Sequence, residues 1–160
     1  MKPKEAGREL ASSQKSENAA DMPETYPCSP RVEIDELPYF PRLAEKVRLF
    51  AAGDLHPELH ANLGKGMDLW ICQFLGIDYD DLKKTILDGA SDSEALAWAQ
   101  KNGVERQDFE LDWFRSYILN RGFRDSLSEH LASRIQEDGF QERKDIFSFC
   151  DYIDADEGRL

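Results

Sequence analysis

Two histidines lie four residues apart within the segment at 54–68, which reads DLHPELHANLGKGMD. On a helix, His56 and His60 would share one face, where they could hold a divalent metal with a carboxylate of Asp54, Glu58 or Asp68. An imidazole at such a position also serves as a helix cap or as part of a polar loop. We favour the cap or loop. The metal site is the alternative, and its candidate ligands are His56 and His60.

Three cations lie close together upstream, where Arg42, Lys46 and Arg48 fall on adjacent faces of one predicted helix. They could form a strip that binds an anion, or a solvated helix face partly neutralised by Glu45, and we favour the solvated face. Asp68 begins a later helix and has no evident structural task. The candidate ligand-binding set of this region consists of Arg31, Arg42, Lys46 and Asp68.

The segment Leu63-Gly64-Lys65-Gly66 has the glycines and the lysine of a phosphate cradle at a helix entry. A Walker loop needs a longer glycine frame and a Ser or Thr after the lysine, and Gly66 stands there instead. A flexible helix entry is the favoured interpretation. Since no Ser, Cys or Thr stands in a nucleophile elbow, no catalytic residue is assigned.

Composition bounds the class of protein. The 160 residues carry a net charge of −12, which argues against nucleic acid as the main partner. No apolar run approaches the roughly 20 residues of a bilayer-spanning helix, and the first residues have no apolar signal region. We therefore expect a cytoplasmic protein without a membrane span.

Three cysteines, Cys28, Cys72 and Cys150, are widely separated along the chain. Their odd number and the lack of a C-x-x-C pair predict neither a disulfide framework nor a zinc ribbon. Cys72 and Cys150 stand inside apolar helical patterns, so they are expected to be small buried side chains.

The sequence around these residues predicts an all-α fold. Residues 1–26 mix charged and small residues without periodicity and are predicted to be a disordered tail; residues 27–160 form a single all-helical domain. Its first part, from Pro27 to Pro41, holds four prolines and is expected to be an extended arm. A short strand around Val32 and Ile34 would have no obvious partner.

Helical periodicity then predicts about seven short helices, packed at steep angles in a compact array. They cover residues 41–52, 67–75, 79–88, 92–102, 108–121, 127–138 and about 146–153, and most end at a glycine. Capping boxes are predicted at Ser91 with Glu94 and at Ser126 with Glu129. The helix at 108–121 is expected to be central, because its broad apolar arc holds Phe109, Trp113, Phe114, Tyr117 and Ile118.

The order of several short motifs resembles an uncharacterised bacterial family, domain of unknown function 5069. The motifs are Ser29-Pro30-Arg31, Phe40-Pro41-Arg42-Leu43 with Lys46 and Arg48, Gly66, Asp68, Phe74-Leu75-Gly76-Ile77-Asp78, Asp92 with Trp98, and Asp156-Glu157-Gly158-Arg159. The resemblance spans residue 28 onward and implies bacterial origin and no known activity. Where the family pattern often has a glycine ahead of Leu-Pro, this chain has Glu36.

Two functions stay open. The favoured one is a non-catalytic subunit, an adaptor or regulator, that binds a protein partner through its surface; no cofactor is predicted. The alternative is a small-molecule or metal-binding enzyme with a site formed by residues 31–68, and it leaves a divalent metal open. Convergence on one pocket would favour the alternative, which uses Arg31, Arg42, Lys46, His56, His60 and Asp68.

Overall fold

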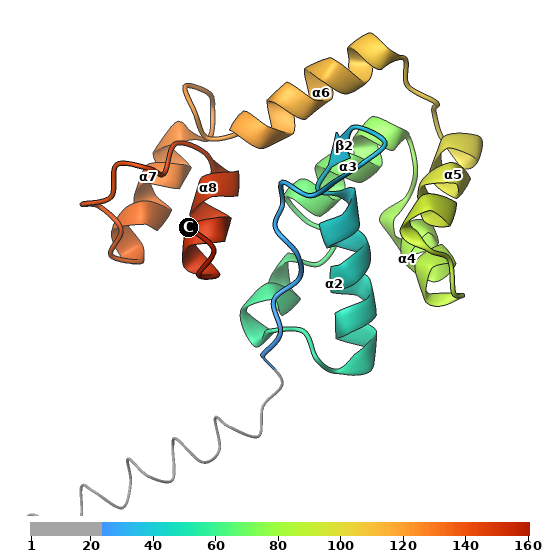
Figure 1. The fold of residues 1–160 in the computed structure, drawn as a ribbon, viewed down its shortest axis with the longest axis horizontal. Coiled ribbons are helices and arrows are strands. Elements are labelled where there is room, and N and C mark those ends of the chain that lie inside the picture. The colour runs from blue at the N-terminus through green and yellow to red at the C-terminus, as the bar shows by residue number, and fades with distance from the viewer. Residues whose placement is uncertain (1–23) are drawn as a thin grey trace, which may run out of the picture.

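The structure is a computed structural model that describes residues 24–160. The predicted all-α class with seven short helices is confirmed, with one 3-10 helix and a two-stranded hairpin added (Figure 1). The elements are β1 (Glu33–Ile34), β2 (Leu37–Pro38), α2 (Phe40–Ala52), η1 (Pro57–Asn62), α3 (Met67–Leu75), α4 (Tyr79–Leu87), α5 (Asp92–Asn102), α6 (Asp108–Asn120), α7 (Ser128–Glu137) and α8 (Phe149–Asp156). The tail predicted at 1–26 lies almost wholly outside the described residues.

Local signals account for the ends of the early helices. Gly53 and Gly76 end α2 and α3 with φ of 77° and 68°, a left-handed conformation that glycine adopts without steric cost. Asp78 and Ser91 cap α4 and α5 by accepting hydrogen bonds from backbone amides. The box predicted at Ser91 is one-sided, because Ser91 accepts from the amide of Glu94 at 3.1 Å while the structure shows no return bond within residues 24–160.

The capping box predicted at Ser126 and Glu129 is wrong. Helix α7 begins at Ser128, and its N-cap residue makes no side-chain cap bond. The carboxylate of Asp125 instead accepts from the amides of Gly122 and Leu127, at 2.9 and 2.8 Å. A complete box lies at the start of α8, where Ser148 and Asp151 cap each other.

The arm carries the strand that had no obvious partner. Strands β1 and β2 pair antiparallel with each other across a turn at Asp35 and Glu36, so the partner is the next segment of the chain. Before the hairpin, Thr25 pairs with Leu55 in an isolated parallel bridge. The arm therefore lies along α2 and the loop that follows it.

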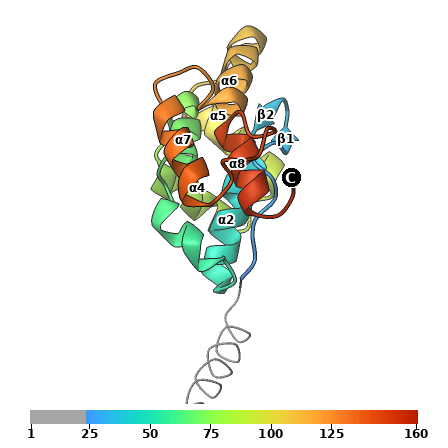
Figure 2. The same ribbon diagram turned by 90° about the vertical axis from the view of Figure 1, so that its left-hand side faces the viewer.

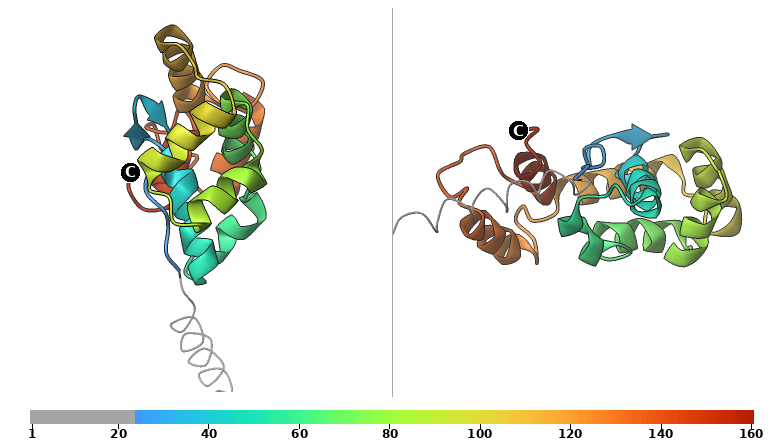
Figure 3. Two further views of the ribbon diagram at one scale, coloured as in Figure 1. Left: turned by 90° about the vertical axis from the view of Figure 1, so that its right-hand side faces the viewer. Right: turned by 90° about the horizontal axis from the view of Figure 1, so that it is seen from below.

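The core is built around α2, which packs on α4 and α5. Phe40, Leu43, Ile71 and Leu82 are among its fully buried side chains. Helix α6 runs along one edge of the molecule and joins the α2–α5 helices to α7 and α8. The α7–α8 pair lies beside the α2–α5 helices (Figures 1 and 3). Seen from their own side, α7 and α8 lie in front of the α2–α5 group (Figure 2).

The expectation that the helix at 108–121 is central and buries its apolar arc is wrong. Phe114 and Ile118 face the core, but Phe109, Trp113 and Tyr117 are 51%, 68% and 44% exposed. Helical spacing identifies which side chains share a face; it does not determine whether another element covers that face. None of the helices in residues 24–160 has the length and apolar character that crossing a bilayer requires.

Candidate functional site

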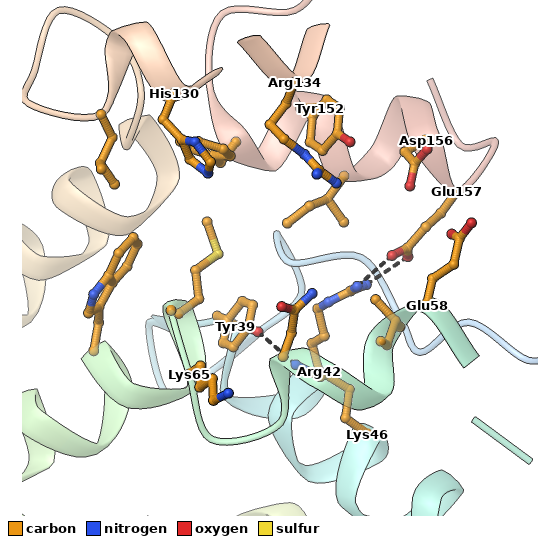
Figure 4. Close-up of a pocket in the computed structure, with 18 of the residues that line it drawn as sticks. Tyr39, Arg42, Lys46, Glu58, Lys65, His130, Arg134, Tyr152, Asp156 and Glu157 are labelled. Carbon is orange, nitrogen blue, oxygen red and sulfur yellow. Dashed lines mark hydrogen bonds and ion pairs between the residues drawn. The ribbon is translucent and has the colours of Figure 1, made fainter. Parts of the chain in front are cut away.

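A cleft of about 760 Å³ separates α7 and α8 from α2, η1 and the start of α3 (Figure 4). Its volume falls in the usual range of small-molecule sites. Polar and charged side chains line it together with Met67, Trp70, Phe149 and Ile153. Segments far apart in the sequence thus form its two walls.

A buried ion pair forms part of the lining. Arg42 donates two hydrogen bonds to the carboxylate of Glu157, at 2.8 and 2.5 Å, and both side chains are only 2% exposed. Arg42 also donates to the carbonyl of Cys28 at 2.9 Å. Because Glu157 follows α8, this pair joins the C-terminal wall of the cleft to α2 and to the arm.

Further polar contacts hold the arm against α8. Ser29 donates to Asp154 at 2.9 Å, and Arg31 pairs with Asp151 and Asp154. Arg159 donates to Glu157 and Asp154, at 2.7 and 3.1 Å, and to the carbonyl of Pro27. Arg31, a predicted ligand-binding residue, therefore helps to hold the arm against α8 and does not line the cleft.

A second buried ion pair lies beneath the cleft. Lys46, which lines the cleft, contacts the two carboxylate oxygens of Asp68 at 2.9 and 3.0 Å, and Asp68 is fully buried. Asp68 also accepts from the Tyr39 hydroxyl at 2.6 Å and from the amide of Gly64 at 2.9 Å. Asp68 thus has a structural task that the sequence did not reveal: it joins α2 to the entry of α3.

The protonation of this group follows from its burial. Burial raises the pKa of Tyr39, and the negative charge of Asp68 raises it further. Burial lowers the pKa of Lys46, while the contact with Asp68 opposes that shift. The arrangement fits a neutral phenol that donates to a carboxylate, which also accepts from an ammonium.

The predicted solvated face of α2 is wrong for two of its three cations. Arg42 and Lys46 are 2% and 3% exposed, and each has a carboxylate partner. Arg48 pairs with Asp92 at 2.7 Å and donates to the carbonyl of Ala90. All three cations therefore connect α2 to other parts of the fold.

The two candidate metal ligands lie outside the lining of the cleft. His56 caps η1, accepting from the amide of Glu58 at 3.3 Å, and its ring stacks on Tyr26. His60 bonds to the carbonyl of Leu55 at 2.9 Å and meets the ring of Phe50 edge-on. Within residues 24–160, no three His, Cys, Asp or Glu side chains are grouped so that they could hold a metal ion.

The cysteines are unpaired. Cys72 and Cys150 are buried, as predicted, and Cys28 is partly buried. Burial raises the pKa of each thiol to about 12. All three thiols therefore stay protonated near neutral pH and are weak nucleophiles.

Polar and charged side chains of the lining occupy two parts of the cleft wall. His130 and Arg134 extend from α7, and Lys65 stands on the α3 side (Figure 4). Glu58 on η1 and Asp156 on α8 lie toward the other end (Figure 4). Neither Arg134 nor Asp156 was predicted as a site residue, although the spacing of His130 and Arg134 already indicates one helix face. Glu58 was predicted only as a possible metal ligand beside His56 and His60.

A second exposed feature lies on α6. Phe109, Trp113 and Tyr117 follow one another at intervals of four residues, and we call this stripe the aromatic face. The rings of Phe109 and Trp113 meet edge-on with centroids 5.1 Å apart. At the other end, the guanidinium of Arg121 lies 4.9 Å from the ring centroid of Tyr117 and 5.2 Å from that of Trp70, which lines the cleft.

Residues 24–159 match the family described as Domain of unknown function (DUF5069), as the motifs indicated. Among curated proteins no relative matches the chain.

Proposed function

This chain belongs to the family described as Domain of unknown function (DUF5069), and we propose that it is a non-catalytic cytoplasmic subunit that binds a protein partner through α6. The single observation that carries the proposal is the aromatic face, whose central Trp113 is 68% exposed. Neighbouring exposed aromatic side chains on one helix are typical of protein interfaces, where Trp and Tyr supply most of the binding energy.

The charges around the aromatic face favour a basic partner. Glu105, Asp108 and Asp112 are exposed on or beside the start of α6. The one cation in the middle of the helix, Arg115, pairs with Glu33 at 2.6 Å. Against this acidic surround and a net charge of −12, the matching partner is an amphipathic helix with apolar residues on one face and Lys or Arg beside them.

Two other observations support a binding function in a reducing compartment. Arg42, Lys46 and Arg48 use their charges in ion pairs that connect elements of the fold. The three cysteines are unpaired, as in most cytosolic proteins. The alternative enzyme at residues 31–68 has less support, since only Arg42 and Lys46 of its six residues line the cleft.

The test uses a defined probe. A synthetic amphipathic helical peptide with Leu on one face and Lys on the other is titrated into the full chain by calorimetry, beside a matched peptide with Glu in place of Lys. We expect the Lys peptide to bind and the Glu peptide not to bind. Trp113→Ala should weaken binding by about tenfold or more, because a central Trp typically contributes about 2 kcal/mol.

Phe147→Ala is the matched control, since Phe147 is an exposed aromatic residue outside α6 and its loss should leave binding unchanged. Equal binding of the two peptides, or an unchanged affinity of Trp113→Ala, would contradict the proposal. Sedimentation of the chain alone adds a further check. A dimer that Trp113→Ala dissociates would assign the aromatic face to a second copy of this chain and overturn the basic-helix partner.

A further inference from the structure

We propose that the cleft between α7–α8 and α2–α3 binds a zwitterionic small molecule, with its carboxylate at His130 and Arg134 and its ammonium at Glu58 and Asp156. This site is separate from the aromatic face and holds none of the residues proposed there. The inference therefore stands whether or not a protein binds α6.

The first step is the balance of charge along the lining. Arg42 and Glu157 neutralise each other, and Lys46 is neutralised by Asp68 beneath the cleft. Apolar side chains also line the cleft, among them Leu59, Met67, Phe149 and Ile153. The charges left for a ligand are therefore those of Lys65 and Arg134 and those of Glu58, Asp156 and Asp138, of which Asp138 also accepts from the Tyr152 hydroxyl.

The cationic end is on α7. His130 and Arg134 are four residues apart, so they share one helix face, and both extend toward the cleft (Figure 4). Arg134 pairs with one carboxylate, Glu137 at 3.7 Å, and its guanidinium lies over the ring of Tyr152, 5.7 Å from the centroid, while its side chain stays 46% exposed. Lys65 approaches from the α3 wall and makes no ion pair with any residue of 24–160. A carboxylate placed here would gain charge-assisted hydrogen bonds, which are the strong ones.

The acidic end is formed by opposite walls. Glu58 from η1 and Asp156 from α8 face the cleft, and neither pairs with a Lys or Arg among residues 24–160 (Figure 4). Burial raises the pKa of Asp156, and the charges of Asp138, Glu58 and Glu157 raise it further, whereas Arg134 lowers it. The carboxylates at this end thus repel one another, and a ligand ammonium would offset that repulsion.

The presence of both signs of charge in one cleft selects the class of ligand. A simple anion would pair with the cations near α7 but leave Glu58 and Asp156 in mutual repulsion. A simple amine would pair with Glu58 and Asp156 but leave the cations near α7 without a partner. A molecule with an ammonium and a carboxylate joined by an apolar chain matches both kinds of charge and the apolar side chains of the lining. Linear amino acids have this chemistry.

The test compares three probes of equal chain length: ε-aminocaproate, caproate, which lacks the ammonium, and hexylamine, which lacks the carboxylate. Each is titrated into the isotope-labelled full chain, and amide chemical shifts are followed by NMR. We expect ε-aminocaproate to shift amides of η1, α7 and α8 and to bind about tenfold more tightly than either single-charge probe, equivalent to ~1.4 kcal/mol. No binding, or equal binding of caproate, would overturn the proposal.

Variants at the two ends give a crossed pattern. Arg134→Gln should weaken ε-aminocaproate and caproate alike and leave hexylamine unchanged, while Asp156→Asn should weaken ε-aminocaproate and hexylamine and leave caproate unchanged. Lys101→Gln and Glu142→Gln are matched controls at exposed positions outside the cleft. If the controls weaken binding as much as the cleft variants do, general electrostatic attraction explains the data and the site is refuted.

Discussion

At the scale of single residues, the turn between β1 and β2 holds two residues in a strained backbone conformation. Asp35 and Glu36 have φ of 46° and 65°, although neither is a glycine. In this left-handed region the Cβ atom approaches the following carbonyl oxygen, which costs roughly 1–2 kcal/mol per residue. Glycine adopts this left-handed conformation without that cost, so the turn at Glu36 is a position that favours glycine.

We expect Glu36→Gly to raise the free energy of unfolding by about 0.5–1 kcal/mol, measured by chemical denaturation. Relief of the left-handed strain exceeds the greater conformational freedom that glycine gives the unfolded chain. Glu36→Ala is the control, because it removes the charge but keeps the Cβ atom. A gain in the alanine variant equal to that in the glycine variant would show that charge, and not backbone strain, is responsible.

Sequence patterns identified several important residues of the candidate region but assigned them the wrong surroundings. Arg42, Lys46 and Asp68 were selected as ligand-binding candidates, and in the structure each takes part in a buried ion pair. Arg42 and Glu157 are 115 residues apart along the chain, and Lys46 and Asp68 are 22 residues apart. Periodicity reports on neighbours three or four residues apart, so pairing over such separations is outside its reach.

At the scale of elements, α8 begins with a capping box that was not predicted, while the box predicted for α7 is absent. Ser148 and Asp151 form the complete box, and Ser148 is buried. Ser126, for which the box was predicted, is exposed, and Asp125 caps the neighbouring amides instead. Both serines have an acidic residue three positions later, so the motif alone does not separate them.

We expect Ser148→Ala to lower the free energy of unfolding by about 1–2 kcal/mol, since a buried cap bond is lost and the amide of Asp151 is left without its partner. Ser126→Ala, the matched control, should change it by less than about 0.5 kcal/mol. Thermal denaturation of both variants measures the difference. Equal effects would mean that the box at Ser148 does not stabilise α8.

Element boundaries were more predictable than element orientation. Helices α2, α3 and α4 end within a residue or two of their predicted bounds, because glycines and caps act within the local chain. The orientation of α6 was not predictable in the same way. Phe114 stacks on Phe74 of α3 with centroids 4.1 Å apart, while Trp113, its neighbour in sequence, faces solvent. Both are aromatic, so hydropathy cannot tell which one the fold covers.

At the scale of the whole molecule, the pair between Arg42 and Glu157 joins the two walls of the cleft. Breaking a buried ion pair on one side leaves an uncompensated charge, at a typical cost of 3–5 kcal/mol. Replacing both partners with apolar side chains removes that charge altogether. Comparing the stability of the single and the double replacement therefore separates the attraction between the two charges from the cost of burying them.

We therefore expect Glu157→Met to lower the free energy of unfolding by about 3–5 kcal/mol and the double change Arg42→Met with Glu157→Met to recover most of the loss, as chemical denaturation would show. Lys84→Met is the control, because Lys84 pairs with Asp88 on the surface and should cost less than about 1 kcal/mol. A double variant no more stable than Glu157→Met would contradict the reasoning. Hydrogen exchange of the α8 amides should accelerate in Glu157→Met alone.

The distance along the chain between Arg42 and Glu157 also affects the order in which the protein can be built. Ribosomes add about 5–20 residues each second, so the 115 residues between them take roughly 6–23 s to synthesise. During that interval α2 exists without its carboxylate partner, and its guanidinium must stay hydrated. The contact between Arg42 and Glu157, and the part of the cleft lining that it forms, can therefore arise only after Glu157 has been synthesised.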